Sequence, residues 1–506
     1  MTRIKNVVAG ISWTTLILIW AGPLSAASID WNVSLGNWTN SANWSPTTVP
    51  GASDNALVRN TGTAQVDTVT ATVDTIITGP GQIDVSAGSL SANTAFIVGS
   101  GAASIINHTG GSVTVGDLST VGDLRVGVSA GGSGTYNISG GTLSALQLIV
   151  GLSSGVGTVN QSGGTVISPF PFIGHASSGV GVYNLSGGTL ISSSGEMDVG
   201  RFANGTLNQT GGSLTATGAG LIIGNTATGV GVYNLTGGSV TLSELVVGSQ
   251  GKGTLNLGNA SSSVTIAESA AGKRMDIVQA NGGSGTLNGW GTIAFTGPLF
   301  NHGRVIANGY GDDSHVLNLT SFSSAGQYGI VQPAGHSNGW FAVDNGKLML
   351  PTLSITPSST KFWGQGGGPL EYVHSIKMDF SSGITSGNLS ISLLAPDRAD
   401  VPATPDGRPF LGVWDFQTSG GFSFGSGSAD LSFRFDDSHD QGADLKLWHH
   451  DGVSWTLLSS TFNDTDHTIS TSGVNSFSIF ALTVPEPSTV VLLALGSMIV
   501  FSRRQR

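Results

Sequence analysis

The octet YNLSGGTL at residues 183–190 decides the fold of this chain, because nearly the same eight letters occur twice more. Residues 136–143 read YNISGGTL, and residues 233–240 read YNLTGGSV. Related octets with Leu or Val in place of Tyr lie between these copies. Asparagine therefore returns after 23, 24, 24 and 26 residues, at Asn137, Asn160, Asn184, Asn208 and Asn234. A fixed period of this length is typical of a solenoid, a propeller or a linear array.

The series continues in weaker form on both sides. It runs back to Asn107 and Asp84, and forward to Asn256 and Asn288. Ahead of each asparagine stands a short apolar segment that ends in Gly, followed by a small polar loop and Gly-x-Gly. These β-branched segments predict strands of about 3–6 residues. Units of about 24 residues suit the coils of a right-handed parallel β-helix, and a propeller with two units per blade is the alternative.

Stacked coils give each repeated residue a physical role. One coil cannot bury its own apolar strands, so it packs on its neighbours about 4.8 Å away, and nine coils predict a rod of about 40 Å. The Gly-Gly pair permits a positive φ at a tight corner. Asparagine at the same corner of every coil is expected to form an amide ladder along one edge and to satisfy turn backbone. This role makes glycosylation at the Asn-x-Ser/Thr sequences the weaker hypothesis.

The composition excludes several classes of protein. Glycine makes up 77 of 506 residues and the hydrophobic share is 39%, which favours a turn-rich β architecture over a disordered chain. The chain has no cysteine, so disulfides, thiolate metal sites and a cysteine nucleophile are excluded. The formal net charge of −11 argues against nucleic acid as a partner, because phosphate binding needs a basic face.

Both ends of the chain have the pattern of targeting segments. Arg3 and Lys5 precede an apolar stretch and a run of small residues, which predicts a signal peptide cut after Ala26 or Ala27; an uncleaved anchor is the alternative. Near the C-terminus, the apolar run 490–501 would form a helix of about 18 Å, short of a bilayer core of about 30 Å. It predicts a short transmembrane helix for transient anchoring, followed by the basic tail of Arg503, Arg504 and Arg506.

These features divide the chain into six parts. The predicted parts are a signal peptide (1–27), an N-terminal cap with first strands (28–79), β-solenoid repeats (80–300), irregular terminal coils (301–352), a small antiparallel β-sandwich (353–483) and a sorting signal (484–506). In the cap, Trp31, Trp38 and Trp44 are expected to form a hydrophobic lid over the first coil, and a sugar-stacking platform is the alternative.

The repeats offer few residues for chemistry. Between residues 131 and 260 the acidic and basic residues do not recur in phase and have no evident acid–base partner; they are Glu196, Asp198, Arg201, Glu244 and Lys252. His175 stands alone, and no cofactor site is predicted.

The C-terminal module raises one metal hypothesis and argues against another. An acidic cluster there suggests calcium, although solvated loop carboxylates are the commoner case; its members are Asp436, Asp437, Asp440 and Asp444. His449 and His450 are adjacent on a predicted strand, so they are expected to face opposite sides and not to share a metal.

Two segments resemble known families. Pro485, Glu486 and Pro487, with the apolar run and the basic tail after them, resemble the PEP-CTERM sorting signal of Gram-negative bacteria that form exopolysaccharide. That resemblance implies export, transient anchoring through the C-terminal helix alone, and processing by an exosortase-type protease. The repeats resemble the autotransporter/PEP-CTERM-associated repeat, but no series of amphipathic strands that would form an autotransporter barrel follows them.

Together these inferences favour a non-enzymatic protein exported through the inner membrane. We expect it at the cell surface or in the extracellular matrix, with a structural or adhesive role in biofilm and with exopolysaccharide or other surface proteins as partners. The alternative is a carbohydrate-binding or carbohydrate-active protein whose site lies on loops in 300–450.

Overall fold

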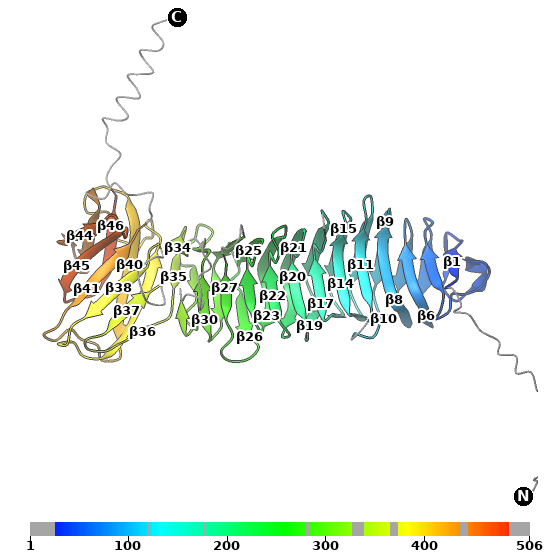
Figure 1. Cartoon of the computed structure of the whole chain (residues 1–506), viewed down its shortest axis with the longest axis horizontal. Coiled ribbons are helices and arrows are strands. Elements are labelled where there is room, and N and C mark those ends of the chain that lie inside the picture. Colours follow the sequence, from blue (N-terminus) through cyan, green and yellow to red (C-terminus); the bar gives the residue numbers. More distant parts are fainter. Residues whose placement is uncertain are drawn as a thin grey trace, which may run out of the picture.

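A computed structural model describes residues 26–118, 121–176, 178–278, 283–325, 339–364, 373–435 and 444–484. They form a long rod of stacked strands that runs into a wider β module at its C-terminal end (Figure 1). The predicted signal peptide up to residue 25, and the sorting segment from residue 485 onward, lie outside the described residues.

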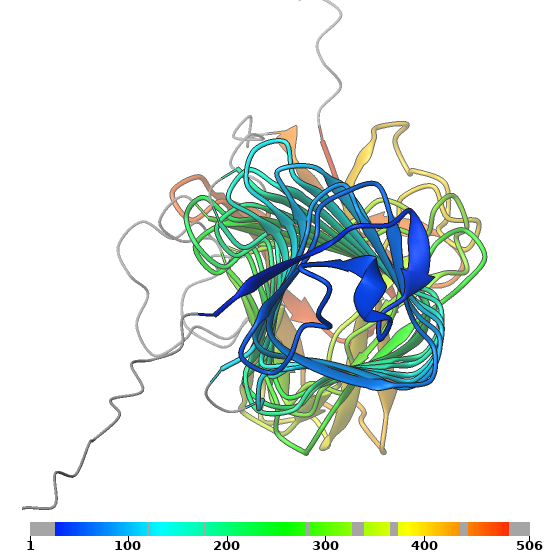
Figure 2. The ribbon, with the colours of Figure 1, turned by 90° about the vertical axis from the view of Figure 1, so that its right-hand side faces the viewer.

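Each coil of the rod contributes one strand to each of three parallel sheets. One coil consists of β12 (Ser133–Ile138), β13 (Thr142–Ala145) and β14 (Gln147–Leu152). These strands pair in parallel with β15 (Val156–Gln161), β16 (Thr165–Ile167) and β17 (Phe170–Ile173) of the next coil. The view along the rod shows the sheets enclosing one core (Figure 2). The fold is therefore the predicted parallel β-helix, and the propeller alternative is wrong.

We name the sheet that carries the repeated asparagines the ladder sheet. Besides β12 and β15, its strands are β2 (Leu35–Asn37), β5 (Thr63–Val66), β7 (Gln82–Val85), β9 (Ala103–His108), β18 (Val180–Leu185), the start of β21 (Asn204–Ala216), the start of β23 (Val230–Leu242), β25 (Lys252–Leu257), β28 (Ser284–Gly289), β31 (Arg304–Ala307) and β34 (Trp340–Val343).

The second sheet follows the ladder sheet in each coil. Besides β13 and β16, it contains the start of β6 (Thr70–Thr78), the start of β8 (Ser89–Ser100), β10 (Ser112–Val115), β19 (Thr189–Ser192), the ends of β21 and β23, β26 (Thr265–Glu268), β29 (Gly291–Ala294), β32 (Val316–Asn318) and β35 (Lys347–Met349).

The third sheet completes each coil. Besides β14 and β17, it contains β1 (Ser28–Trp31), β4 (Asn55–Val58), the ends of β6 and β8, β11 (Asp123–Val128), β20 (Glu196–Val199), β22 (Gly220–Ile223), β24 (Leu245–Val247), β27 (Met275–Ile277), β30 (Pro298–Asn301) and β33 (Ser324–Ala325).

The solenoid is longer than the repeat motif predicts. The described residues make about 12 turns, which at about 4.8 Å per turn span roughly 55–60 Å instead of 40 Å. Stacking begins with β1, whose residues already pair in parallel with β4, and it continues to β35. Residues 28–79 and the described residues of 301–352 are therefore coils as well, although they lack the asparagine motif.

Alternation of inward residues explains why the closest copies of the octet lie about fifty residues apart. Tyr183 and Tyr233 point inward and are fully buried. Their hydroxyls donate to Gln161 Oε1 at 2.6 Å and to Gln209 Oε1 at 2.5 Å, and each glutamine comes from the preceding coil. A buried hydroxyl needs a partner, so a coil with Tyr must follow a coil with a polar residue beside its asparagine.

Both glycines of the Gly-Gly corner are required, for different reasons. The second has a positive φ in each repeat, for example 75° at Gly188. The first has an ordinary φ but no room: a Cβ on Gly187 would lie 2.3 Å from the backbone oxygen of Ser162 in the preceding coil. The corner therefore excludes side chains because coils lie so close together.

The N-terminal end is closed by tryptophans, as the sequence predicts. Trp31, Trp38 and Trp44 are at most 3% exposed. The Trp44 ring lies edge-on to both others, with centroids 4.9 and 4.8 Å apart, and its Nε1 donates to the Trp38 carbonyl. A short 3-10 helix (Ser41–Asn43) and β3 (Trp44–Ser45) hold this lid in place. Buried rings cannot serve as a sugar-stacking platform.

The C-terminal module is the predicted antiparallel sandwich, but it is not a separate body. Strand β35 of the last coil pairs antiparallel with β39 (Gly387–Leu394), so the solenoid sheet continues into the module. That sheet also holds β36 (Leu353–Ile355), β40 (Phe410–Ser419), β42 (Lys446–His450), β43 (Trp455–Leu457) and β46 (Ile479–Thr483).

A second sheet packs on it through aromatic side chains. Its strands are β37 (Thr360–Trp363), β38 (Ile376–Phe380), β41 (Ala429–Arg434), β44 (Thr461–Asn463) and β45 (Thr468–Val474). Phe433 from this sheet lies 4.9 Å from Trp414 and 6.0 Å from Phe480, measured between ring centroids. The module therefore buries the open edge that a solenoid would otherwise expose.

The corner geometry predicts that Gly187→Ala destabilises the protein by about 2–4 kcal/mol in free energy of unfolding, because backbone of two coils must separate. The matched control is Gly79→Ala, since Gly79, like Gly187, has no positive φ, but a Cβ there lies 3.6 Å from its nearest neighbour, an ordinary contact. This control should change the free energy of unfolding by at most about 1 kcal/mol. Chemical denaturation measures both, and equal losses would contradict the close packing of coils.

Candidate functional site: the polar face of the solenoid

The repeated asparagines form one continuous ladder on the outside of the rod. Each amide from Asn107 to Asn288 donates its Nδ2 hydrogen to the side-chain oxygen of the residue one coil earlier, over 2.8–3.3 Å. The backbone register places the same residues opposite one another in every step. The predicted alignment along a single edge is confirmed.

The amide ladder forms as predicted, but its position differs from the prediction, and the expected bonds to turn backbone are not made. The asparagines lie within ladder-sheet strands, on the outward face, and not in the corners. They bond to one another and not to turn backbone. The reason is that equivalent outward residues of neighbouring coils lie about 4.8 Å apart. At this spacing, one side-chain amide can donate a hydrogen bond directly to the amide oxygen of the next.

The ladder has a direction and a charged end. All amides donate toward the N-terminus, and the last acceptor is the carboxylate of Asp84, which takes Asn107 Nδ2 at 2.9 Å. Gln82 donates to the same oxygen at 2.7 Å. A carboxylate only accepts hydrogen bonds, so it suits the position where the column of donors ends. The ladder sheet continues from Asp84 toward the N-terminus through β5 and β2, but the column of asparagines ends at Asp84.

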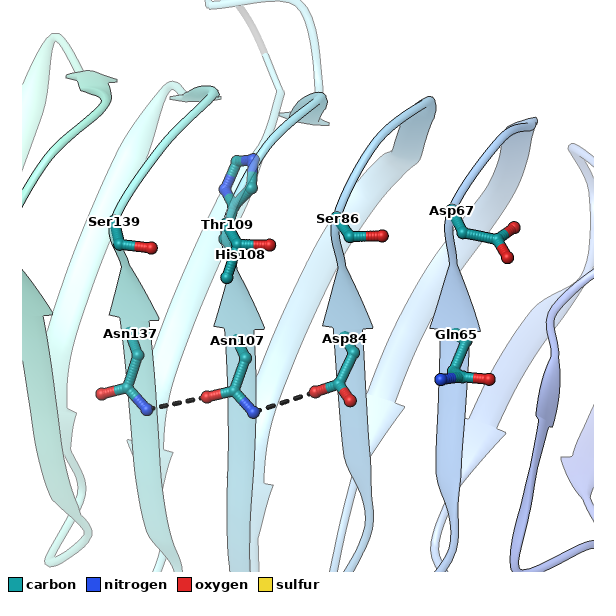
Figure 3. Close-up of a pocket in the computed structure, with 9 residues that line it drawn as sticks. All are labelled: Gln65, Asp67, Asp84, Ser86, Asn107, His108, Thr109, Asn137 and Ser139. Carbon is teal, nitrogen blue, oxygen red and sulfur yellow. Dashed lines mark hydrogen bonds between the residues drawn. The ribbon is translucent and has the colours of Figure 1, made fainter.

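A groove runs beside this end of the ladder. Two rows of side chains line it (Figure 3). One row holds the ladder residues Gln65, Asp84, Asn107 and Asn137, and the other, just past the end of each strand, holds Asp67, Ser86, Thr109 and Ser139. The groove has a volume of about 500 Å³ and is lined by amides, hydroxyls and two carboxylates, with His108 near its edge. Such a surface suits a ligand rich in hydroxyl groups, because both partners donate and accept hydrogen bonds.

A second polar cluster lies on the third sheet, and sequence reasoning missed it. Glu196 and Asp198 were taken as unpartnered, yet they are two apart on β20 and face the same side. Asn225 Nδ2 bridges them at 3.0 Å to each carboxyl group. Arg201 Nε lies 3.5 Å from Asp198 Oδ2, without hydrogen-bond geometry. The spacing of two on a strand was the signal that could have revealed the pair.

Burial, together with the charge of Glu196, raises the pKa of Asp198 to about 8. The carboxyl side chain is 0% exposed, and its Oδ2 has no hydrogen-bond partner among the described residues. The Arg201 guanidinium, which lies over the Phe172 ring at 4.3 Å from the centroid, lowers the pKa of Asp198 by less than burial raises it. The raised pKa favours the protonated form of Asp198 at neutral pH, so the folded protein keeps a proton in this cluster.

The metal hypotheses find no support in the described part of the chain. Within those residues no group of three or more His, Asp or Glu side chains is placed to hold a metal ion. Of the acidic cluster only Asp444 is described; Asp436, Asp437 and Asp440 lie outside. His449 stacks on Phe480 and His450 lies against Trp455, which confirms that the two rings face opposite sides.

The residues predicted for sorting cannot be placed by the structure. Pro485, Glu486, Pro487 and the arginines 503, 504 and 506 lie outside the described residues. Among the residues that are described, no helix is long and apolar enough to cross a membrane. The predicted C-terminal transmembrane helix therefore stays a prediction.

Comparison with known proteins identifies the C-terminal segment. Residues 483–506 match the family model of the PEP-CTERM protein-sorting motif. This match supports an exported protein that is sorted through an exosortase in a Gram-negative bacterium. The search found no matching curated protein and no matching solved structure.

Asp198 gives the solenoid a defined pH dependence. Its folded pKa of about 8 exceeds the unfolded value of about 4, so the native state holds a proton that the unfolded chain releases in this window. The free energy of unfolding should fall from pH 4 to pH 8, with a slope of at most about 1.4 kcal/mol per pH unit from this group.

Asp198→Asn cannot ionise and should lose this slope, so its stability relative to the unmodified protein should improve toward pH 8. Denaturation across the pH range measures it. The matched control is Asp379→Asn. Burial raises the pKa of Asp379, but hydrogen bonds to Lys377 and Thr360 outweigh it and leave the pKa lowered, so the slope above about pH 5 should stay in place. The same slope for Asp198→Asn and the unmodified protein would contradict the assignment.

Proposed function

We propose that this protein is a structural and adhesive component of the cell surface or biofilm matrix, with exopolysaccharide or other surface proteins as partners. The observation that carries the proposal is the ladder face. From Asn107 to Asn288 it presents amides at regular intervals along the rod. Its flanking outward row alternates threonine with valine, as Thr158, Val182, Thr206, Val232 and Thr254. A long, uncharged, hydrogen-bonding surface suits many weak contacts with a hydroxyl-rich polymer.

The sorting motif supports the same assignment from the other end of the chain. Export and processing by an exosortase would deliver the rod to the outside of the cell. There the absence of cysteine removes any need for an oxidising folding pathway. Stability comes instead from the continuous core, which is built to be long rather than to surround a reaction centre.

We propose that the protein is not an enzyme. The alternative, a carbohydrate-active or carbohydrate-binding site on loops in 300–450, has less support among the described residues. The pocket described in that region has a volume of about 100 Å³, and it lies between the last coil and β37. Its lining combines Leu350, Pro351 and Phe362 with serines, and it brings together no set of Asp and His side chains.

Cell fractionation tests the sorting step. With Pro485, Glu486 and Pro487 all replaced by Ala, we expect an unprocessed protein that stays with the membrane fraction, because the protease has lost its recognition sequence. The unmodified protein should be found processed, at the surface or in the matrix. The matched control replaces Pro402 and Pro405 by Ala. Identical processing and location of the altered and unmodified proteins would refute the sorting role.

The same fractions test the adhesive role. The exported protein should sediment with exopolysaccharide from producing cells and should appear in the medium of cells that make none. A protein that is free in the medium of both would overturn the adhesive assignment, whatever its processing.

A further inference from the structure

The loops that join the third sheet to the ladder sheet differ in length from coil to coil. Residues 174–181 read GHASSGVG and residues 224–231 read GNTATGVG, whereas the coil between them has only GRFANG at 200–205. The strands on both sides keep their register: Val180 pairs with Asn204, and Asn204 with Val230. Two residues are therefore missing from the loop alone, and a hollow remains between two taller neighbours.

The structure shows a pocket at this point, which we call the notch. It has a volume of about 590 Å³, within the range of small-molecule sites. The short loop contributes Phe202, Ala203 and Asn204 to its lining. The taller loops contribute His175 and Ser178 on one side and Thr228 on the other. The notch therefore follows directly from the loop lengths.

An exposed aromatic ring lines the notch. Phe202 is 41% exposed, although neighbouring residues contact its ring and its backbone. Its ring lies edge-to-face with His175, with centroids 5.9 Å apart, and the Arg201 guanidinium is 5.6 Å from its centroid. The Phe202 carbonyl also accepts a hydrogen bond from Thr228 Oγ1 at 2.8 Å. The ring is thus fixed in position while part of its surface faces solvent.

Polar groups surround this ring and are available to a ligand. Among the described residues, neither the Asn204 amide nor the Ser178 hydroxyl has a hydrogen-bond partner, and both residues are exposed. Burial and the nearby Arg201 lower the pKa of His175, so its imidazole is neutral at physiological pH. An aromatic surface beside neutral donors and acceptors is complementary to a sugar ring, which has an apolar C–H face and hydroxyls at its edge.

We propose that the notch is a saccharide subsite, in which a pyranose ring of a polysaccharide packs on Phe202 and bonds to Asn204 and Ser178. This proposal rests on the proposed adhesive function and gives it a defined contact point. The ladder face would then supply many weak contacts along the polymer, and the notch one specific contact.

Saccharide titration tests the subsite. The purified full-length protein is titrated with soluble tetrasaccharides of glucose, galactose, mannose and N-acetylglucosamine, and binding is measured by calorimetry. At least one tetrasaccharide should bind. Phe202→Ala should weaken that binding about fivefold to tenfold, and Phe202→Tyr should retain it, because the stacking surface is kept. Tyr310→Ala is the matched control, since Tyr310 is 37% exposed but does not line the notch.

Each outcome supports or overturns the saccharide subsite. Loss of binding in Phe202→Ala, with thermal unfolding unchanged, supports the subsite. Equal binding by Phe202→Ala and the unmodified protein overturns it, as does the absence of binding to every tetrasaccharide. Either negative result leaves the matrix fractionation as an independent test of the adhesive function. Conversely, notch-dependent binding by a protein that never sediments with exopolysaccharide would refute the adhesive role and keep the subsite.

Discussion

The structure depends on one constraint: the backbone of every coil must hydrogen-bond, in register, to the coil before it. This constraint fixes where each residue of the repeat lies. Outward residues meet their own copies, so Asn184 donates to Asn160 and accepts from Asn208. Inward residues meet the core residues of the neighbouring coil, so Tyr183 donates to Gln161 of the preceding coil. The corners leave no space for a side chain at Gly187.

The length of the coil is free to vary where the chain leaves the sheets, and the notch arises there. The third-sheet strands end at the same level in each coil, so a change of two residues in a loop becomes a hollow or a ridge on the surface. The groove at Asp84 and the notch at Phe202 are of different origin. The first marks the end of the amide ladder, and the second marks a short loop between long ones.

The features that repeat along the chain were predicted from the sequence. The partners of individual side chains and strands were not. Asparagine spacing, the Gly-Gly corner and the tryptophan lid each have a local signature, and all three are found. The amide ladder was predicted, but it was placed in the corners and expected to satisfy turn backbone, because the sequence does not show where each strand ends. The pairing of Glu196 with Asp198 was readable from their spacing. The antiparallel pairing of β35 with β39 was not, since it joins segments about forty residues apart with no shared motif.

A distance measurement between paired spin labels tests the stacked register most directly. The chain has no cysteine, so labels can be attached to Thr158→Cys with Thr254→Cys, and to Thr135→Cys with Thr286→Cys. The first pair is separated by four coil steps and the second by six, which predicts roughly 19 Å and 29 Å along the rod. A separation that grows by about 4.8 Å per coil supports the account. Two pairs at equal distance, or a broad distribution for either, would contradict it.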